Sequence, residues 1–65
     1  MMKAFDPSEV LKPLDSLNLH DQAVVAANCE TEEWHLSSAI RKVAVNFNVS
    51  YRQAEVWVGE VFDSV

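Results

Sequence analysis

The chain has 65 residues, and its ten Asp and Glu against five Lys and Arg give a formal net charge of -5. A chain of this length buries only about 60% of the surface that its unfolded form exposes, which leaves room for one small domain and excludes most self-contained enzyme folds. With 49% hydrophobic residues it is too apolar for a disordered acidic tail, yet it lacks the long uncharged apolar run of a membrane span. We therefore expect a single small domain over residues 1–65, with residues 1–5 flexible.

The first residues do not resemble a secretory signal, because no apolar stretch follows Lys3 before Asp6 and Pro7. A cytoplasmic location without a membrane anchor is therefore expected. Cys29 is the only cysteine, so the chain cannot form an internal disulfide. Noncovalent packing alone must hold the fold.

The first predicted element is a short helix over residues 7–12. Asp6 is a suitable N-cap, Pro7 suits the first helical position, and Pro13 disfavours helical geometry in the residue before it. The helix has room for no more than a turn or two. Its apolar residues, expected to pack on the rest of the domain, are Val10 and Leu11.

A second helix is predicted over residues 19–28. Asn18 is a good N-cap, and Asp21 three residues later makes the sequence close to a capping box. At about 100° per residue, one side of this helix carries Leu19, Ala23, Ala26 and Ala27. Val25 falls off that side, which suggests contact on two faces. No glycine or proline enforces a stop, so continuation into the next helix stays open.

The third helix is predicted to begin after Thr31 as N-cap, with Glu32 and Glu33 in the first turn, where the helix dipole favours acidic side chains. Its core-facing stripe consists of Leu36, Ala39, Ile40, Val43 and Phe47. The opposite side carries Trp34, Ser38, Arg41 and Val45. Such a second apolar face is unusual for a solvated surface.

The last helix has the clearest predicted start. Ser50 and Gln53 form a capping box, Val49 and Ala54 have the spacing of a hydrophobic staple, and Asn48 suits the left-handed turn before them. The apolar arc of this helix consists of Ala54, Trp57, Val58, Val61, Phe62 and Val65. No strand pattern occurs in the chain, so we predict an all-α domain of three to four helices.

Residues 40–59 resemble the helix-turn-helix unit of phage and bacterial repressors. That family keeps a small residue within its first helix, where Ala44 stands, and a small or branched residue in its second, where Ala54 stands. It usually has glycine at the turn, where this chain has Asn48. Its apolar positions are matched by Val43, Phe47, Val49 and Trp57. Two steeply crossed helices approach closely at the small residues, and the larger residues fill the wedge between them.

The resemblance implies that the last helix would enter the major groove of DNA, as in a dimeric transcriptional regulator. The residues facing bases or phosphates would be Arg41, Lys42, Tyr51, Arg52, Gln53, Glu55 and Val56. The stretch from Trp34 to Gln53 has three basic residues and no acid, which favours this interpretation. The net charge of -5 opposes it, because phosphate neutralisation by Lys and Arg provides much of the affinity for DNA.

A protein-binding role is the interpretation that the sequence favours. Trp34 and Val45 share one helix face and Val56 falls off the apolar arc of its own helix, which leaves more apolar surface than three helices can bury. The expected interface, with another protein or with a second copy of the chain, consists of Trp34, Arg41, Val45 and Val56. The alternative is that this apolar surface packs within the chain against the N-terminal turn. Residues 1–33 hold seven acids and two bases. This acidic half either keeps the protein soluble or docks on a basic partner.

Catalytic and metal sites are not expected. His20, Cys29 and His35 lack the spacing of a metal site or a thiol–imidazole pair, and the chain has no phosphate-binding loop. Cys29 is better explained as a small buried apolar residue. The sequence thus predicts a small non-enzymatic regulatory protein without a cofactor, which binds another protein. An inhibitor or antirepressor of a DNA-binding protein would fit, and a dimeric helix-turn-helix DNA-binding regulator is the alternative.

Overall fold

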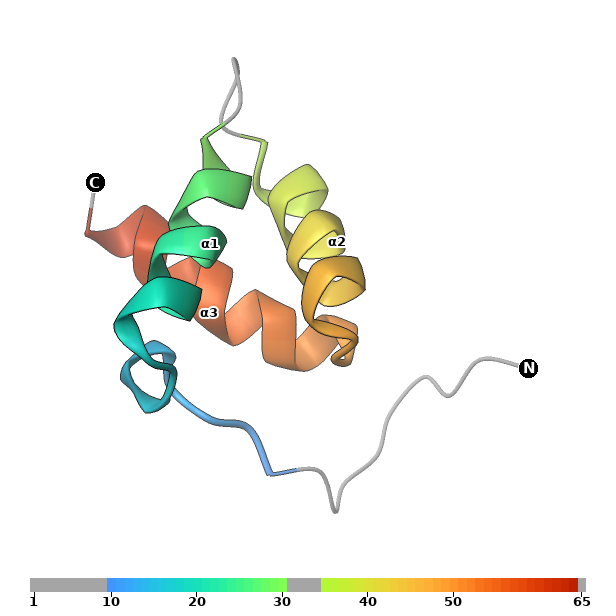
Figure 1. Cartoon of the computed structure of the whole chain (residues 1–65). Coiled ribbons are helices and arrows are strands. Elements are labelled where there is room, and N and C mark those ends of the chain that lie inside the picture. The colour runs from blue at the N-terminus through green and yellow to red at the C-terminus, as the bar shows by residue number, and fades with distance from the viewer. Residues whose placement is uncertain (1–9, 31–34, 65) are drawn as a thin grey trace.

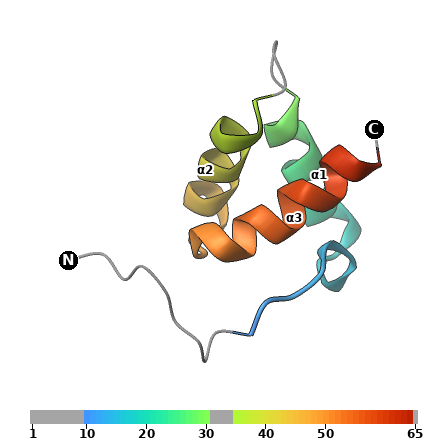
Figure 2. The same ribbon diagram turned by 180° about the vertical axis from the view of Figure 1, so that it is seen from behind.

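A computed structural model describes residues 10–30 and 35–64 and places three α-helices in a small bundle (Figure 1). The elements are a 3-10 turn, η1, at Leu14–Ser16, and the helices α1 at Leu19–Cys29, α2 at Leu36–Phe47 and α3 at Tyr51–Asp63. Each helix contacts the other two. The view from behind shows α3 starting below the end of α2 and passing in front of α1 (Figure 2). The described part of the chain is all-α and contains no strand, as predicted.

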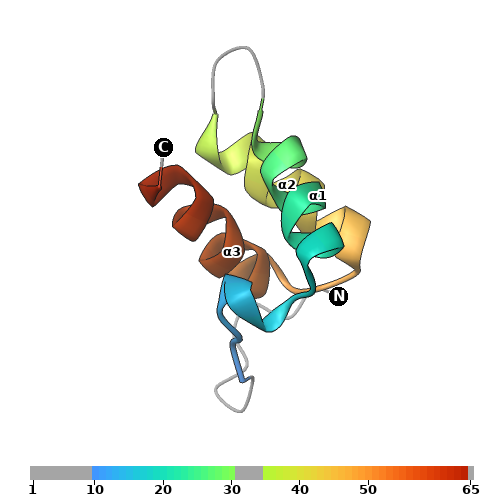
Figure 3. The ribbon, with the colours of Figure 1, turned by 60° about the vertical axis from the view of Figure 1, so that its left-hand side comes forward.

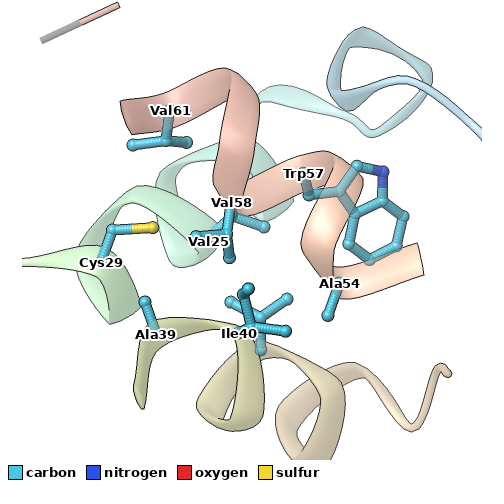
Figure 4. Packing of buried hydrophobic residues seen from close by; sticks show 9 residues of the cluster. Val25, Cys29, Ala39, Ile40, Ala54, Trp57, Val58 and Val61 are labelled. Carbon is cyan, nitrogen blue, oxygen red and sulfur yellow. The ribbon is translucent and has the colours of Figure 1, made fainter. Parts of the chain in front are cut away.

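Apolar side chains from all three helices form the core. Among the described residues, the buried members are Val25, Cys29, Ala39, Ile40, Val43, Ala54, Trp57, Val58 and Val61. Val25, Ile40 and Val58 lie together at its centre (Figure 4). The Trp57 indole closes one side, where its ring meets the Phe47 ring edge to face at a centroid distance of 5.4 Å. Removal of these surfaces from water is the main favourable term in folding so small a chain.

Helix α1 has the predicted cap and nearly the predicted length. The Asn18 side chain accepts a hydrogen bond from the Asp21 backbone N–H at 2.7 Å, which satisfies one of the N–H groups that lack a partner in a first turn. The helix extends to Cys29, and Glu30 leaves helical geometry with a ψ of 87°. A continuous helix from α1 into α2 is therefore excluded.

The buried face of α1 is centred on Val25, which the sequence places off the alanine-rich side. Most of the alanine-rich side faces solvent: Leu19 is 83% exposed and Ala23 and Ala27 are exposed as well, but Ala26 is half-buried against the core. Val25 and Cys29, one helical turn apart, are fully buried instead. The neighbouring helices bury one stripe of α1, and the larger Val25 side chain gains more from burial than alanine methyl groups do.

Helix α2 begins later than predicted. Its N-cap is His35, whose ψ of 114° is extended, so no helix runs through from a cap at Thr31. The helix therefore starts at Leu36. The prediction that Leu36 belongs to the core is wrong, because its side chain lies in the first turn and is 47% exposed. The core begins at the next turn of the same stripe, where Ala39, Ile40 and Val43 are buried.

The turn between α2 and α3 is the predicted left-handed one. Asn48 has φ 53° and ψ 48°. The Asn48 N–H donates to the Val45 carbonyl at 3.3 Å, and the Val49 N–H donates to the Ala44 carbonyl at 3.1 Å. This pair of bonds is a Schellman motif, which satisfies carbonyls that a helix end leaves without partners.

Helix α3 begins as predicted, with the Ser50 hydroxyl accepting a hydrogen bond from the Gln53 N–H at 3.1 Å. The predicted arc is confirmed for Ala54, Trp57, Val58 and Val61, which are buried, and Phe62 is half-buried against the same core. Val65 lies outside the described residues. Every helix in the described part is too short or too polar to cross a bilayer.

The predicted helix over residues 7–12 is wrong where the structure describes it. Residues 10–12 have no regular secondary structure, Val10 is 78% exposed, and Pro13 is extended at φ -72° and ψ 166°. Residues 12–17, here called the strap, include η1 and lie along α3 (Figure 3). The physical reason is that main-chain groups of the strap form hydrogen bonds with side chains of α3. In a helix, the same main-chain groups would have bonded to one another.

Candidate interaction surfaces

The outer face of α2 carries the most exposed apolar side chain of that helix. Val45 is 81% exposed. Arg41 lies four residues before it and Lys42 three, so all three share a face of the helix, and both basic residues are exposed. The buried residues of α2 occupy the other side. We call Arg41, Lys42 and Val45 the α2 face.

Charge is divided unevenly among the described residues. Residues 35–54 carry Arg41, Lys42 and Arg52 and no carboxylate. The described carboxylates lie in η1, at both ends of α1 and along α3, at Asp15, Asp21, Glu30, Glu55, Glu60 and Asp63. They are therefore spread over several elements, and the basic region belongs to α2 and the first turn of α3.

The first two turns of α3 present part of the set that the helix-turn-helix resemblance implies. Arg52 and Glu55 are exposed, and Tyr51 is 48% exposed. Val56 is half-buried and packs against the edge of the core. Its surface is accordingly smaller than that of Val45. Trp34, the remaining member of the predicted interface, lies outside the described residues.

Gln53 is not presented to a duplex. It is 6% exposed, and its amide is used by the strap: Oε1 accepts from the Lys12 N–H at 2.8 Å, and Nε2 donates to the Lys12 carbonyl at 2.9 Å. The prediction that Gln53 faces bases or phosphates does not fit this arrangement. A helical wheel places Gln53 beside the core, where the strap covers it.

Two further α3 side chains bond the strap backbone. Trp57 Nε1 donates to the Pro13 carbonyl at 3.3 Å, and Glu60 Oε2 accepts from the Leu14 N–H at 2.8 Å. Sequence reasoning missed these contacts together with the Gln53 pair. Partners more than forty residues apart leave no local sequence pattern, and an extended strap gives no periodic signal either.

A cleft with a volume of about 360 Å³ opens between the strap and the beginning of α3. The described residues that line it are Lys12, Ser16, Leu17, Val49, Ser50, Gln53 and Trp57. Leu17, Val49 and Trp57 supply the apolar part of the wall. Lys12 is the only charged residue among them. None of these residues belongs to α2, so the cleft and the α2 face are separate features.

His20, Cys29 and His35, which the structure describes, do not share a common site. Cys29 is fully buried, and burial, followed by the nearby Glu30 carboxylate, raises the pKa of its thiol above the ordinary value. His20 Nδ1 lies 3.3 Å from Asp21 Oδ1 at the exposed start of α1, and His35 is the N-cap of α2. Among the described residues, no three His, Cys, Asp or Glu are grouped to hold a metal ion.

Comparison with protein-family models, with curated proteins and with solved structures found no match.

Proposed function

We propose that this chain is a small non-enzymatic regulatory protein that acts by binding another protein through the α2 face. The observation that carries the proposal is Val45, an 81% exposed valine flanked by two exposed cations. An isolated exposed apolar residue is ordinary on a protein surface. An apolar residue framed by Arg41 and Lys42 has the composition of a small interface, in which a desolvated centre is surrounded by charge.

The charge of the α2 face indicates the chemistry of the partner. Arg41 and Lys42 lie in a region without described carboxylates, so a complementary surface would be acidic and would offer an apolar recess for Val45. An acidic regulator-binding surface on another protein fits, and so does a second copy of this net-acidic chain. A DNA-binding protein remains a candidate partner, now through its acidic surface.

Site-specific photocrosslinking tests this proposal. The photoreactive residue p-benzoylphenylalanine would replace Val45 in one sample and Leu19 in the control. Leu19 is a matched position because it is 83% exposed, on α1. The expected result is a discrete protein adduct from position 45 that resists nuclease. The adduct should be absent from position 19 and lost when Arg41→Glu and Lys42→Glu are introduced.

Equal adducts from both positions, or an adduct from position 45 that nuclease removes, would contradict protein binding through the α2 face. Self-association is tested separately by light scattering over a concentration series with wild type and Val45→Asp. A wild type that dimerises and a Val45→Asp variant that stays monomeric would identify the second copy as the partner. The same series with Trp34→Ala tests the predicted contribution of that residue to the interface.

A helix-turn-helix DNA-binding regulator is the second candidate. The observation that favours it is the basic region of α2 and α3, with exposed Arg52 in the first turn of α3. Selection from a randomised duplex pool at physiological salt tests it. A two-fold-symmetric site whose binding collapses with Arg52→Ala but not with Lys12→Ala would make this candidate the better account. Equal weak binding to every duplex that is steeply lost with salt would contradict sequence-specific DNA binding and leave protein binding as the better account.

A further inference from the structure

The cleft between the strap and α3 has the dimensions and composition of a small-molecule site. Its volume of about 360 Å³ is within the usual range of about 300 to 1,000 Å³ for ligand pockets. Leu17, Val49 and Trp57 form the apolar part of the lining, and Lys12, Ser16, Ser50 and Gln53 form the polar part. This is the usual make-up of such sites, in which apolar surface provides affinity and a few polar groups orient the ligand.

Most polar groups of the cleft are already used within the fold. The Gln53 amide holds the Lys12 backbone, and the Ser16 hydroxyl donates to the Pro13 carbonyl at 2.7 Å. The Ser50 hydroxyl accepts from the Gln53 N–H. Lys12 is the one charged residue among those that line the cleft, and no Asp or Glu is among the described lining residues.

From this geometry we infer that the cleft binds a small amphipathic anion. Its aromatic or aliphatic body would lie against Leu17, Val49 and Trp57, and its carboxylate would pair with the Lys12 ammonium. The Lys12 backbone is fixed to α3 by the two hydrogen bonds of Gln53, so the root of the lysine side chain has a set position at the cleft. A cationic ligand is not favoured, because no carboxylate that could pair with it is among the described lining residues.

The inference is independent of the proposed protein interface. No residue of the cleft lies on α2, so occupation of the cleft leaves Arg41, Lys42 and Val45 uncovered. A ligand in the cleft would contact the strap on one side and α3 on the other. Its binding should accordingly hold the strap in place, and the exchange of the Lys12 amide proton with solvent should slow.

Two probes of nearly equal shape test the inference, 1-naphthoate as the anion and 1-naphthamide as its neutral counterpart. Each is titrated into ¹⁵N-labelled full-length protein and followed by two-dimensional NMR. The expected result with naphthoate is a saturable shift of the Trp57 indole N–H and of the Leu17 and Gln53 amides. Lys12→Gln should weaken naphthoate binding by about threefold or more, the effect of losing a partly exposed ion pair. Naphthamide should bind more weakly and be insensitive to that change.

Lys42→Gln is the matched control, since Lys42 is an exposed lysine outside the cleft. It should leave naphthoate binding unchanged, and the dispersion of each variant spectrum shows whether its fold is intact. Equal binding of the two probes, equal weakening by Lys12→Gln and Lys42→Gln, or shifts confined to residues outside the cleft would each overturn the inference. Absence of any saturable shift with naphthoate would overturn it as well.

Discussion

The side-chain amide of Gln53 holds both main-chain groups of Lys12, accepting from its N–H at 2.8 Å and donating to its carbonyl at 2.9 Å. One α3 side chain thus pairs both main-chain groups of a residue that lies outside regular secondary structure. Because Gln53 is 6% exposed, the two bonds are partly shielded from competing water. The strap is consequently a bound part of the fold, and it forms one wall of the cleft.

Replacement of Gln53 by methionine should detach the strap. Gln53→Met keeps the approximate volume and removes both hydrogen bonds, each of which contributes about 0.5 to 1.5 kcal/mol. We expect the free energy of unfolding in urea to fall by about 1 to 3 kcal/mol, and hydrogen exchange at the Lys12 amide to become fast. Glu55→Gln, an exposed change on the same helix, should stay within about 0.5 kcal/mol of wild type. A slow Lys12 amide in Gln53→Met would contradict this account of the strap.

The helix ends could be predicted from the sequence because their determinants are local. The Asn18 and Ser50 caps each bond an N–H three residues further along, and the Asn48 turn is closed by bonds spanning three and five residues. Side chains and main-chain groups this close in sequence meet whatever the rest of the chain does. The buried residues of α2 and α3 could also be predicted from the sequence, because the apolar residues of these helices repeat at helical spacing.

The face of α1 and the path of the strap could not be predicted, because both depend on distant residues. The periodicity of α1 is weak, and alanine fits a solvated surface as readily as a core, so only the positions of α2 and α3 decide that Val25 is buried. The strap follows α3 through partners 41 to 46 residues away. The cleft exists only where the strap meets α3. Because these two segments are far apart in the sequence, no local pattern predicts the cleft.

Replacing Asn48 by glycine should maintain or raise the stability of the protein, and replacing it by alanine should lower the stability. Its φ of 53° lies in the left-handed region, which glycine enters freely, asparagine tolerates and alanine resists at a cost of roughly 1 kcal/mol. We expect Asn48→Gly to match or exceed the wild-type free energy of unfolding and Asn48→Ala to fall about 1 kcal/mol below the glycine variant. Urea unfolding of the three proteins checks the order, and an alanine variant as stable as the glycine variant would contradict the left-handed turn.

Removal of the Ser50 cap should destabilise the start of α3. Ser50→Ala loses the hydroxyl that accepts from the Gln53 N–H, a change that costs about 1 kcal/mol at N-cap positions. Ser37→Ala, in the exposed first turn of α2, provides a matched serine-to-alanine control without a cap. Circular dichroism during urea unfolding should show a lower midpoint for Ser50→Ala and little change for Ser37→Ala. Equal midpoints for the two variants would count against the cap.

Stability at alkaline pH should depend on Cys29. Burial, and then the Glu30 carboxylate, raises the pKa of the folded thiol above its ordinary value of 9.0. Between these two pKa values the folded protein binds more protons than the unfolded chain, so its stability falls as pH rises through this window. Below the unfolded pKa the contribution is fully present. Wild type should therefore lose more stability than Cys29→Ala as the pH is raised above the ordinary thiol pKa of 9.0, and parallel losses would contradict the buried thiol's role.

Gly59 should be replaceable by alanine with a gain in stability. It lies within α3 at an ordinary helical dihedral, since no described glycine has a positive φ, and a Cβ added there meets nothing within 4 Å. Glycine costs a helix interior roughly 0.5 to 1 kcal/mol relative to alanine, chiefly through the entropy of the unfolded chain. We expect Gly59→Ala to raise the free energy of unfolding by about that amount.

The reciprocal change is the control for Gly59→Ala. Ala23→Gly on the exposed side of α1 should lower the free energy of unfolding by a similar amount, because neither position packs against the core. Urea unfolding of the two single variants and of the double variant measures both effects, which should nearly cancel in the double variant because the sites lie on different helices. A loss of stability in Gly59→Ala would mean that the outer face of α3 is closely covered in the folded protein.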